Sequence, residues 1–312
     1  MVTVLIATHN GADSLPQTLD SLCRIDTGGL DWRVVAVDNA STDATPAILR
    51  AFSDRLPLTI LEEKRRGKNY AMNTGLDAVR SDLVFCIDDD VVLSKTWMLA
   101  LKRAFDTQPD FDIACGPVEP LWPDTTPPWL LEVIPGTPAY SITPPGIGEG
   151  PCSPRIVSGP NMAFRMAIVR AGHRFNPAVG TDGTRFYAMG SDTEFTLRVH
   201  AAGYKAWFCR DARVLHIIHP FQLERGWLWT RAMAFGRGDV QKARRENPKA
   251  NDVARVFGVP RYGLALVARH ALAAALATLQ GDRRAQYRTL WECGYACGAV
   301  YEGWRESRGI RP

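Results

Sequence analysis

Short apolar runs alternate with amphipathic segments over the first 120 residues of the chain. The runs are rich in Val, Ile and Leu and span 2–7, 33–37, 58–61 and 83–87. The segments between them have the length of helices and span 14–24, 43–53 and 68–79. This alternation predicts an α/β fold with a mostly parallel sheet covered by helices on both faces. Right-handed crossovers then place the loop after each strand at one edge of the sheet, where ligands bind.

The alternation stops at residues 117–154, which hold 11 of the chain's 21 prolines. This density of proline predicts a long irregular loop, and loops of that length inside compact domains are often functional. A strand pattern resumes at 156–165. We expect a helix to begin at Ser191, because serine is a favourable N-cap and Glu194 follows three residues later.

After His219 the pattern becomes helical. Residues 221–236 are amphipathic and aromatic, whereas 238–260 are polar and indicate a linker. Residues 261–280 are strongly apolar, but Arg269 and the adjacent histidine interrupt the run. We therefore expect a buried or interfacial helix there rather than a membrane-spanning one.

Composition fits a globular chain with one large domain or a domain plus an appendage: 312 residues, 46% hydrophobic and 22% charged. The seven cysteines show no zinc-finger spacing or disulfide framework, so we expect reduced thiols. No signal peptide is visible before the first strand, so we expect a cytoplasmic location. Residues 221–312 hold 16 Lys/Arg and 8 Asp/Glu, a charge of +8, against −4 in 1–220. This basic, aromatic region either contacts anionic lipid or a phosphate-bearing acceptor, or is a solvated helix surface.

Three carboxylates, Asp88, Asp89 and Asp90, directly follow the apolar run 83–87. Adjacent carboxylates repel one another, so such a cluster indicates a neutralising cation. Their oxygens suit Mg²⁺ or Mn²⁺, which also bridge a diphosphate. Because the cluster lies at the expected ligand edge, a metal site is favoured over an acidic surface turn. His216 is a further candidate metal ligand, although a lone histidine is more often structural.

Three other polar segments carry candidate chemistry. Asp38 ends the run 33–37 and either accepts a hydrogen bond from an imide N–H, as on uracil, or caps the next helix. The basic loop 65–69 contains Lys68 and either binds phosphate at a helix start or is a solvated turn. Asp192, at another helix start, would stay ionised beside the helix dipole, which suits a general base for a hydroxyl, with capping as the alternative.

In this order, the segments resemble the family 2 glycosyltransferases with the GT-A fold. The opening VLIATHN, with Thr8 and Asn10, is similar to that family's first strand. VVAVDNASTD around Asp38 looks like its nucleotide-base strand, and RGKNYAMNTG, with Lys68 and Asn73, looks like its diphosphate-side helix. The triplet DDD matches its Asp-x-Asp metal motif.

The second half of the resemblance concerns the acceptor side. GPNMAFR, with Gly159 and Asn161, resembles the family's acceptor-side segment. GSDTE, with Asp192 and Glu194, resembles its catalytic-base motif, but Ser191 stands where the family more commonly has Glu, so the role of that position differs.

The resemblance implies a GT-A (Rossmann-like) domain over 1–236, with a nucleotide-sugar half at 1–116 and an acceptor half at 117–236, and a helical C-terminal extension over 237–312. The implied reaction moves a sugar from a nucleotide-diphosphate donor, a UDP-sugar being favoured, to a carbohydrate or lipid-linked hydroxyl with inversion. The basic, aromatic C-terminal region adds the hypothesis that this reaction serves polysaccharide or glycolipid synthesis. Peripheral contact with the inner face of a membrane through the C-terminal region is part of this expectation.

The resemblance also implies a role for each site residue. The donor would be bound by Thr8, Asn10, Asp38, Lys68, Asn73, Asp88 and Asp89. Mn²⁺ or Mg²⁺ would be held by Asp90, Asp88 and His216. Asp192 would deprotonate the acceptor hydroxyl, and Gly159, Asn161, Glu194 and Trp227 would lie on the acceptor side.

Two alternatives stand beside this interpretation. A sugar-phosphate nucleotidyltransferase would carry a Gly-rich, Arg-containing loop after its first strand, whereas this loop reads THNGADS. A non-catalytic nucleotide-sugar binder or membrane scaffold would have lost acidic residues that this chain retains. Nucleic acid is not an expected partner, since the basic surplus is modest and no recognition module is apparent.

Overall fold

The computed structural model describes residues 1–184, 187–247, 255–256 and 259–310. The chain forms two compact units, each built from separate stretches of sequence. The first unit comprises Met1–Leu121, Ser141–Pro177 and Ser191–Ile218. The second comprises Trp122–Tyr140, Ala178–Gly190 and His219–Pro312. The sequence-based boundary at residue 236 falls inside a helix of the second unit, and the division into donor and acceptor halves stays a prediction.

An eight-stranded sheet forms the centre of the first unit, in the order β3-β2-β1-β4-β9-β6-β10-β8. Its strands are β1 (Val2–Thr8), β2 (Trp32–Asp38), β3 (Leu58–Glu62), β4 (Leu83–Ile87), β6 (Ile113–Cys115), β8 (Gly150–Cys152), β9 (Met162–Arg165) and β10 (Ala206–Phe208). The four strands β3-β2-β1-β4 are mutually parallel, and β9 then runs antiparallel between β4 and β6. The parallel half matches the four strands predicted from the apolar runs.

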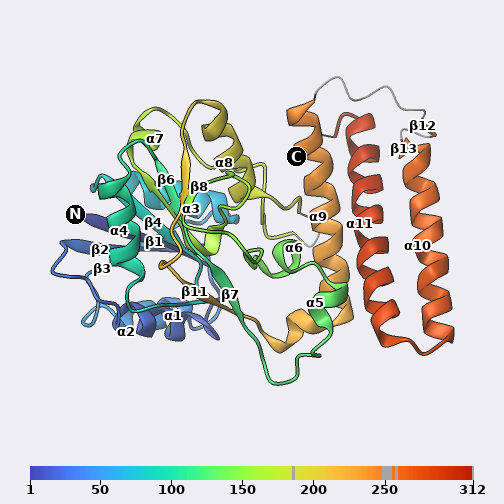
Figure 1. Cartoon of the computed structure of the whole chain (residues 1–312), viewed down its shortest axis with the longest axis horizontal. Coiled ribbons are helices and arrows are strands. Elements are labelled where there is room, and N and C mark those ends of the chain that lie inside the picture. The colour runs from blue at the N-terminus through green and yellow to red at the C-terminus, as the bar shows by residue number, and fades with distance from the viewer. Residues whose placement is uncertain (185–186, 248–254, 257–258, 311–312) are drawn as a thin grey trace. The chain divides into compact units, whose positions relative to one another are not determined.

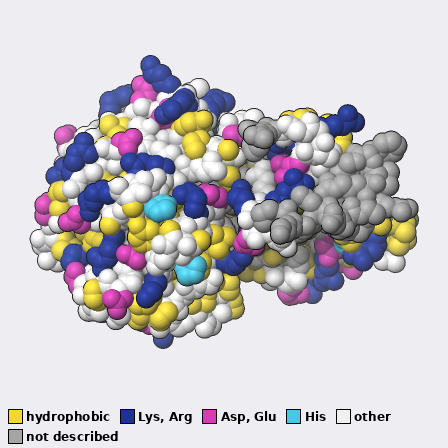
Figure 2. Space-filling view, turned by 90° about the horizontal axis from the view of Figure 1, so that it is seen from above, with side chains coloured by type: hydrophobic (Ala, Val, Ile, Leu, Met, Phe, Trp, Pro, Cys, Tyr) yellow, Lys and Arg dark blue, Asp and Glu magenta, His cyan; other side chains and the backbone are white. Residues whose placement is uncertain are grey.

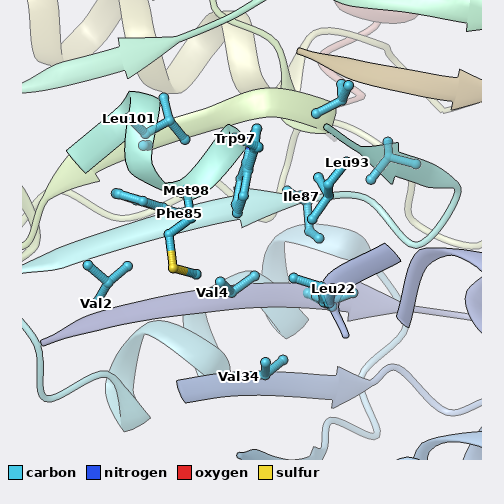
Figure 3. Close-up of a cluster of buried hydrophobic side chains, with 14 of the residues drawn as sticks. Val2, Val4, Leu22, Val34, Phe85, Ile87, Leu93, Trp97, Met98 and Leu101 are labelled. Atoms are coloured by element: carbon cyan, nitrogen blue, oxygen red, sulfur yellow. The ribbon is translucent and has the colours of Figure 1, made fainter. Parts of the chain in front are cut away.

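Helices cover both faces of this sheet because alternate strand residues point to opposite sides. Val2, Val4 and Ile6 of β1 pack into one cluster, with side chains from α1 (Leu15–Leu22), α2 (Thr45–Ala51) and α4 (Trp97–Thr107). Figure 3 shows the centre of this cluster around Phe85 and Trp97. Leu5 packs on the other face, with side chains from α3 (Lys68–Ala78), α7 (Ala167–Arg170) and α8 (Ser191–Ala201).

A second, three-stranded sheet lies in the same unit, in the order β5-β11-β7. It consists of β5 (Val91–Leu93), β7 (Val118–Leu121) and β11 (Val214–Ile217). The antiparallel register of β11 with β5 places His216 opposite Val91. His216, far from β4 in the sequence, thus reaches the residues that follow that strand.

The segment 117–154 is more regular than its proline content predicts, so the expectation of an irregular loop is wrong in part. Besides β7 and β8 it holds two short helices, α5 (Leu130–Val133) and α6 (Gly136–Tyr140). Short elements tolerate this composition because proline fits strand edges and first helical turns. Of the expected strand at 156–165, only β9 is extended, preceded by the 3₁₀ turn η1 (Gly159–Asn161).

Three long helices make up most of the second unit: α9 (Arg225–Glu246), α10 (Arg261–Leu279) and α11 (Arg283–Ser307). Figure 1 shows them side by side, with α11 between α9 and α10. A 3₁₀ turn, η2 (Pro220–Leu223), precedes α9, and the strands β12 (Arg255–Val256) and β13 (Val259–Pro260) pair before α10. None of the helices among the described residues is both long and apolar enough to cross a bilayer.

The predicted linker at 238–260 is wrong over its first nine residues, because α9 continues to Glu246. The rest of that range lies partly outside the described residues. Two glycines at the predicted boundary of this linker serve close packing. A Cβ on Gly236 would lie 2.1 Å from the carbonyl oxygen of Tyr295, and one on Gly238 would lie 1.9 Å from that of Met189. A glycine inside a helix can mark a tight contact rather than an end.

Candidate active site

The carboxyl ends of three neighbouring parallel strands carry polar side chains at one edge of the sheet. Thr8 ends β1, Asp38 ends β2, and Asp88 follows β4. In parallel sheets these ends face the same way and form the usual ligand edge. The structure therefore brings together three of the residues that the sequence selects for donor binding.

Lys68, at the first position of α3, connects this edge to the start of α8. Its Nζ lies 2.5 Å from Oδ1 of Asp88. The Gly159 amide donates to Oδ2 of Asp192 at 3.0 Å. A Cβ on Gly159 would lie 2.6 Å from that oxygen and 2.9 Å from Nζ of Lys68, so the ammonium and both carboxylates meet around Gly159. The candidate donor side and the candidate base are thus adjacent in the first unit.

The charges of this cluster depend on one another. Burial alone lowers the pKa of Lys68, but the carboxylates of Asp88 and Asp192 outweigh burial and hold that pKa above its ordinary value. Lys68 is therefore a permanent cation at neutral pH. Burial raises the pKa of Asp88, and the Lys68 ammonium opposes this rise. The Lys68 ammonium thus offsets part of the cost of burying the Asp88 carboxylate.

Asp89 points to β1 rather than to Lys68. Its Oδ2 accepts a hydrogen bond from the Thr8 hydroxyl at 2.5 Å, and its carbonyl oxygen accepts one from the Thr18 hydroxyl at 2.9 Å. Burial and the neighbouring Asp90 raise the pKa of Asp89 to about 7. These contacts indicate that Asp89 and Thr8 fix the loop after β4.

Asp90 pairs with His216 of the second sheet: its Oδ2 lies 3.1 Å from Nε2 of the imidazole. The carbonyl oxygen of Asp90 also accepts the Ile217 amide at 2.8 Å. In the part of the chain that the structure describes, no group of three or more His, Cys, Asp and Glu side chains is arranged to hold a metal. The expected ligand trio is therefore not assembled, since Asp88 is engaged by Lys68.

A two-residue metal site nevertheless suits the chemistry. Mg²⁺ and related ions in phosphate-binding sites take one or two carboxylates and complete their coordination with phosphate oxygens and water. An imidazole beside the carboxylate adds a ligand that transition metals accept. Asp90 and His216 fit a divalent ion that shares its coordination with a bound diphosphate.

The loops after β1 and β2 are bound to each other through side chains. The Asn10 amide oxygen accepts the Thr42 backbone amide at 2.8 Å, and the Asn10 backbone amide donates to the Ser41 hydroxyl at 2.9 Å. Asp38 is buried, and its Oδ1 accepts the Ser41 amide at 3.2 Å. Asn10 thus orders the loop that follows Asp38, and Asp38 itself bonds to that loop. Asp38 does not cap the next helix, because α2 has Ala44 at its N-cap position and no side-chain cap hydrogen bond there.

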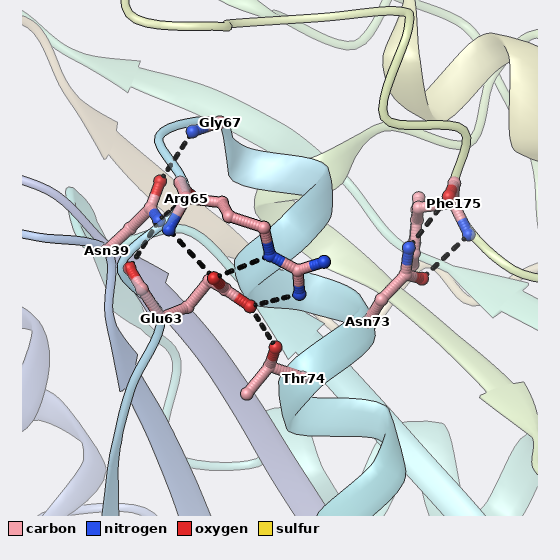
Figure 4. Close-up of polar contacts among 7 residues, drawn as sticks. All are labelled: Asn39, Glu63, Arg65, Gly67, Asn73, Thr74 and Phe175. Carbon is pink, nitrogen blue, oxygen red and sulfur yellow. Dashed lines mark hydrogen bonds and ion pairs between the residues drawn. The ribbon is translucent and has the colours of Figure 1, made fainter.

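A hydrogen-bonded network beside Asp38 was missed by sequence reasoning (Figure 4). The side chain of Asn39 accepts the Gly67 amide at 2.8 Å and donates to the carbonyl oxygens of Glu63 and Arg65 at 2.9 and 2.7 Å. It therefore holds the turn that leads into Lys68. The motif around Asp38 contained Asn39, but its type alone did not distinguish this role from turn formation.

Glu63 is the buried centre of the same network. Its carboxylate accepts from Nε and Nη2 of Arg65 at 2.9 and 2.6 Å, and from the Thr74 hydroxyl of α3 at 2.6 Å. The hydrogen bonds from Arg65 lower the pKa of Glu63 to about 2. Glu63 and Asn39 together fix the start of α3 relative to β2 and β3.

Four further predicted residues have their polar groups or ring faces engaged within the protein. The Asn73 amide exchanges two hydrogen bonds with the Phe175 backbone, at 2.8 and 3.0 Å (Figure 4). Asn161 is fully buried and bonds to Trp97 and to two backbone carbonyl oxygens. Glu194 pairs with Arg198 at 2.8 Å. In the second unit, Trp227 stacks with Tyr140 and lies under an arginine guanidinium. These contacts support structural roles for all four.

Ser191 begins α8, as predicted, but not through the expected capping box. Its hydroxyl donates to Oδ1 of Asn69 at 2.6 Å, and the Asn69 amide donates to the carbonyl oxygen of Asn176 at 2.7 Å. Ser191 thus ties α8 to α3, the helix that carries Lys68. This contact aligns the two helix starts that supply the candidate base and the candidate cation.

Comparison with known proteins places this site in a family. The family model described as glycosyl transferase family 2 matches residues 3–172, more than half of the chain. The chain is 25% identical over 248 residues to "Glycosyltransferase AglE" of Haloferax volcanii, covering 77% of this chain and 73% of that protein. It is 34% identical over 104 residues to "Succinoglycan biosynthesis protein ExoO" of Rhizobium meliloti, covering 33% of this chain and 29% of that protein.

Solved structures with the same fold extend over nearly the whole chain. The mannosyltransferase PcManGT from Pyrobaculum calidifontis, in complex with GDP-Man and Mn²⁺, aligns with a TM-score of 0.62 and 23% identity, covering 98% of this chain and 87% of that one. TarS of S. aureus in complex with UDP aligns with a TM-score of 0.56 and 14% identity, covering 98% and 91%. At these identities the likeness concerns the fold, and it confirms the expected fold class.

Proposed function

Because the chain belongs to glycosyl transferase family 2, and is therefore a glycosyltransferase that uses a nucleotide-sugar donor, we propose that it transfers the sugar to an acceptor hydroxyl with inversion. We favour a UDP-sugar as donor and polysaccharide or glycolipid synthesis as the pathway. The family sets the nucleotidyltransferase alternative aside. The proposal includes a carbohydrate or lipid-linked acceptor and a cytoplasmic reaction at the inner face of a membrane.

The observation that carries the proposal is the meeting of Asp88, Lys68 and Asp192 around Gly159. Asp88 follows the strand at the ligand edge, and Lys68 is a cation beside it that can interact with the donor diphosphate. Asp192 lies on the other side of the ammonium, at a helix start that favours the anion. Direct displacement requires one carboxylate to act as the base, and Asp192 is the carboxylate of this cluster that lies outside the acidic triplet.

In the proposed reaction, Asp192 takes the proton from the acceptor hydroxyl as its oxygen forms a bond to the anomeric carbon. The bond between that carbon and the diphosphate oxygen breaks, and the nucleoside diphosphate leaves with the electron pair. Attack opposite the leaving group inverts the anomeric configuration. Lys68 offsets the negative charge that builds on the departing diphosphate.

Asp38 would bind the base, with Thr8, Asn10 and Asp89 ordering the surrounding loops. Asp90 and His216 would hold Mn²⁺ or Mg²⁺, which stabilises a diphosphate leaving group as a Lewis acid when bound. Use of Mn²⁺ agrees with the ion in the PcManGT complex. The compared structures contain GDP-Man in one case and UDP or UDP-GlcNAc in the other, so both bases belong in the test.

The deciding experiment measures nucleotide release from a panel of UDP-, GDP- and dTDP-sugars with Mn²⁺ or Mg²⁺. Release from one donor, lost in Asp90→Ala and Asp192→Asn but kept in Asp106→Asn, is the expected result. Asp106 is a matched control because it is an exposed carboxylate that pairs with Lys102. If the protein with metal shows no nucleotide release and no calorimetric donor binding, the donor site is refuted and the scaffold alternative is favoured. The anomeric configuration of the product, determined by NMR, tests inversion.

A further inference from the structure

Helix α10 has two faces with different surroundings. Gly263, His270 and Ala277 recur every seven residues and face α11. A Cβ on Gly263 would touch Val300 at 3.0 Å, Nδ1 of His270 lies 3.0 Å from the Glu292 carboxylate, and Ala277 is buried. With 3.6 residues per turn, positions 264, 265, 268, 272, 275, 276 and 279 lie on the opposite side. This side faces away from α9 and α11 (Figure 1).

That outer side is apolar and exposed from Leu264 to Leu279. Leu272, Leu276 and Leu279 are 63%, 48% and 85% exposed, and Leu264 is 42% exposed. The positions between them on this side are alanines: Ala265, Ala268 and Ala275. We call these seven residues the α10 stripe. A continuous apolar stripe on a helix surface marks an interaction site.

The charged side chains on α10 itself are basic, and the Glu292 carboxylate of α11 lies on its other face, against His270. Residues 253–281 contain no Asp or Glu, while Arg269 lies on α10 and Arg283 begins α11. Arg269, Arg283 and Arg288 are exposed. The acid in the turn, Asp282, caps α11 by accepting the Ala285 amide at 3.0 Å. Figure 2, in contrast, shows Lys and Arg mixed with Asp and Glu over the part of the surface facing its viewer.

We propose that the α10 stripe, with its flanking arginines, is a docking surface for an anionic phospholipid bilayer. Leucines on one side of a helix enter the boundary between headgroups and acyl chains, and arginines at its margins bind lipid phosphates. A second copy of the chain on the same stripe would bring arginine against arginine, which opposes association. The surface deepens the peripheral membrane contact named in the proposed function, and it is independent of the transfer chemistry.

The test is flotation of the full chain with vesicles of phosphatidylcholine alone, or of phosphatidylcholine and phosphatidylglycerol in equal parts. The protein is expected to float with the mixed vesicles, and to do so less as salt is raised, because exposed charges are screened. Leu272→Gln/Leu276→Gln/Leu279→Gln is expected to lower the partition coefficient at least about tenfold. The control is Phe221→Gln, an exposed aromatic residue on η2, which keeps wild-type binding.

The charged margin is tested separately. Arg269→Gln and Arg283→Gln should each weaken binding to mixed vesicles by about fivefold, while Arg245→Gln, an exposed arginine on α9, should not. We expect the helical circular dichroism signal and nucleotide release without vesicles to stay at wild-type values in all variants. The first shows that the variant is folded and the second that its transfer chemistry is intact, so a lower vesicle binding then reports loss of docking alone. Equal binding to both vesicle types, no binding to either, or a triple variant that binds normally would overturn the proposal. A change from oligomer to monomer in the triple variant, without vesicle binding by the wild type, would assign the stripe to self-association instead.

Discussion

Substitution of Gly159 by alanine tests whether the geometry around Asp192 controls the reaction. The added Cβ would lie 2.6 Å from Oδ2 of Asp192, about 0.8 Å inside an ordinary contact of 3.4 Å. The Lys68 ammonium, at 2.9 Å, has a long flexible stem and can withdraw, whereas the Asp192 side chain in the first turn of α8 is short and can yield only by moving its carboxylate. The carboxylate must therefore shift by nearly the full overlap. A misplacement of about 1 Å in a reacting group costs about 10²-fold in rate, so we expect kcat to fall by that factor.

The fold should tolerate the same change. The Gly159 backbone lies outside the left-handed region, so alanine adopts its conformation without strain. We expect the melting temperature and the calorimetric donor affinity to stay near wild type, with the loss confined to turnover. Gly148→Ala is the matched control, because Gly148 is an exposed glycine of the same unit with no atom within 4 Å of the added Cβ.

A double-mutant cycle identifies the residue through which Gly159→Ala acts. If the added methyl group displaces Asp192, then Gly159→Ala should have little further effect in an Asp192→Asn background. Additive losses would mean that the methyl group acts elsewhere, for example on the acceptor directly. Wild-type turnover in Gly159→Ala would refute the inference that the position of Asp192 limits the reaction.

Three other predictions concern metal, charge and packing. Chelation should abolish nucleotide release and Mn²⁺ should restore it in the wild type but not in Asp90→Ala; release that persists in chelator would rule out a metal requirement. Glu63→Gln should lower the free energy of unfolding by about 1 kcal/mol near neutral pH, a value discounted because Arg65 is largely exposed. The folded-state pKa of Glu63 lies below its ordinary value of 4.5. The difference in unfolding free energy between wild type and variant is therefore complete above about pH 4.5 and shrinks as pH falls towards 2. Denaturant titrations at several pH values check this, and a difference that grows in acid would contradict it. Gly238→Ala should destabilise the second unit by about 1–3 kcal/mol, because its Cβ would overlap the Met189 carbonyl oxygen, whereas Gly226→Ala in the same helix, with open space around it, should leave the melting temperature unchanged or slightly higher.

The sequence predicted the parallel half of the sheet because each of its four strands is an apolar run of ordinary length, although only β1, β2 and β4 are largely buried. β1, β2, β3 and β4 all match their predicted ranges to within a residue or two. The same pattern located Asp38 and Asp88, since both directly follow such a run. Elements stabilised by contacts far along the chain were not visible in this way. β11 contributes His216 through pairing with β5 and β7, more than 90 residues away from either, and no local pattern encodes that pairing.

Glycine and asparagine were the least predictable residues, because their roles depend on what approaches them. Gly238 resembles a helix end in sequence, yet it lies within α9 where the Met189 backbone comes close. Asn73 and Asn161 stand in motifs associated with ligand binding, yet their amides bond to backbone groups of Phe175, Pro117 and Ala212. Residue type determines whether a side chain can donate or accept a hydrogen bond, or, for glycine, whether another group can approach closely. Only the tertiary structure determines which partner it meets.

The candidate site contains two kinds of residues: charged groups and the residues that position them. The charged residues that the sequence identified, Lys68, Asp88 and Asp192, lie together around Gly159. The uncharged or internally paired residues around them, Asn39, Glu63 and Ser191, bond to the loops and helix starts that carry those charges. A charged group in a partly buried position is stable only where its neighbours hold its counter-ion in place. The positioning residues are therefore as necessary to the site as the charges, and variants of Asn39 or Glu63 should alter turnover without removing any group that contacts substrate.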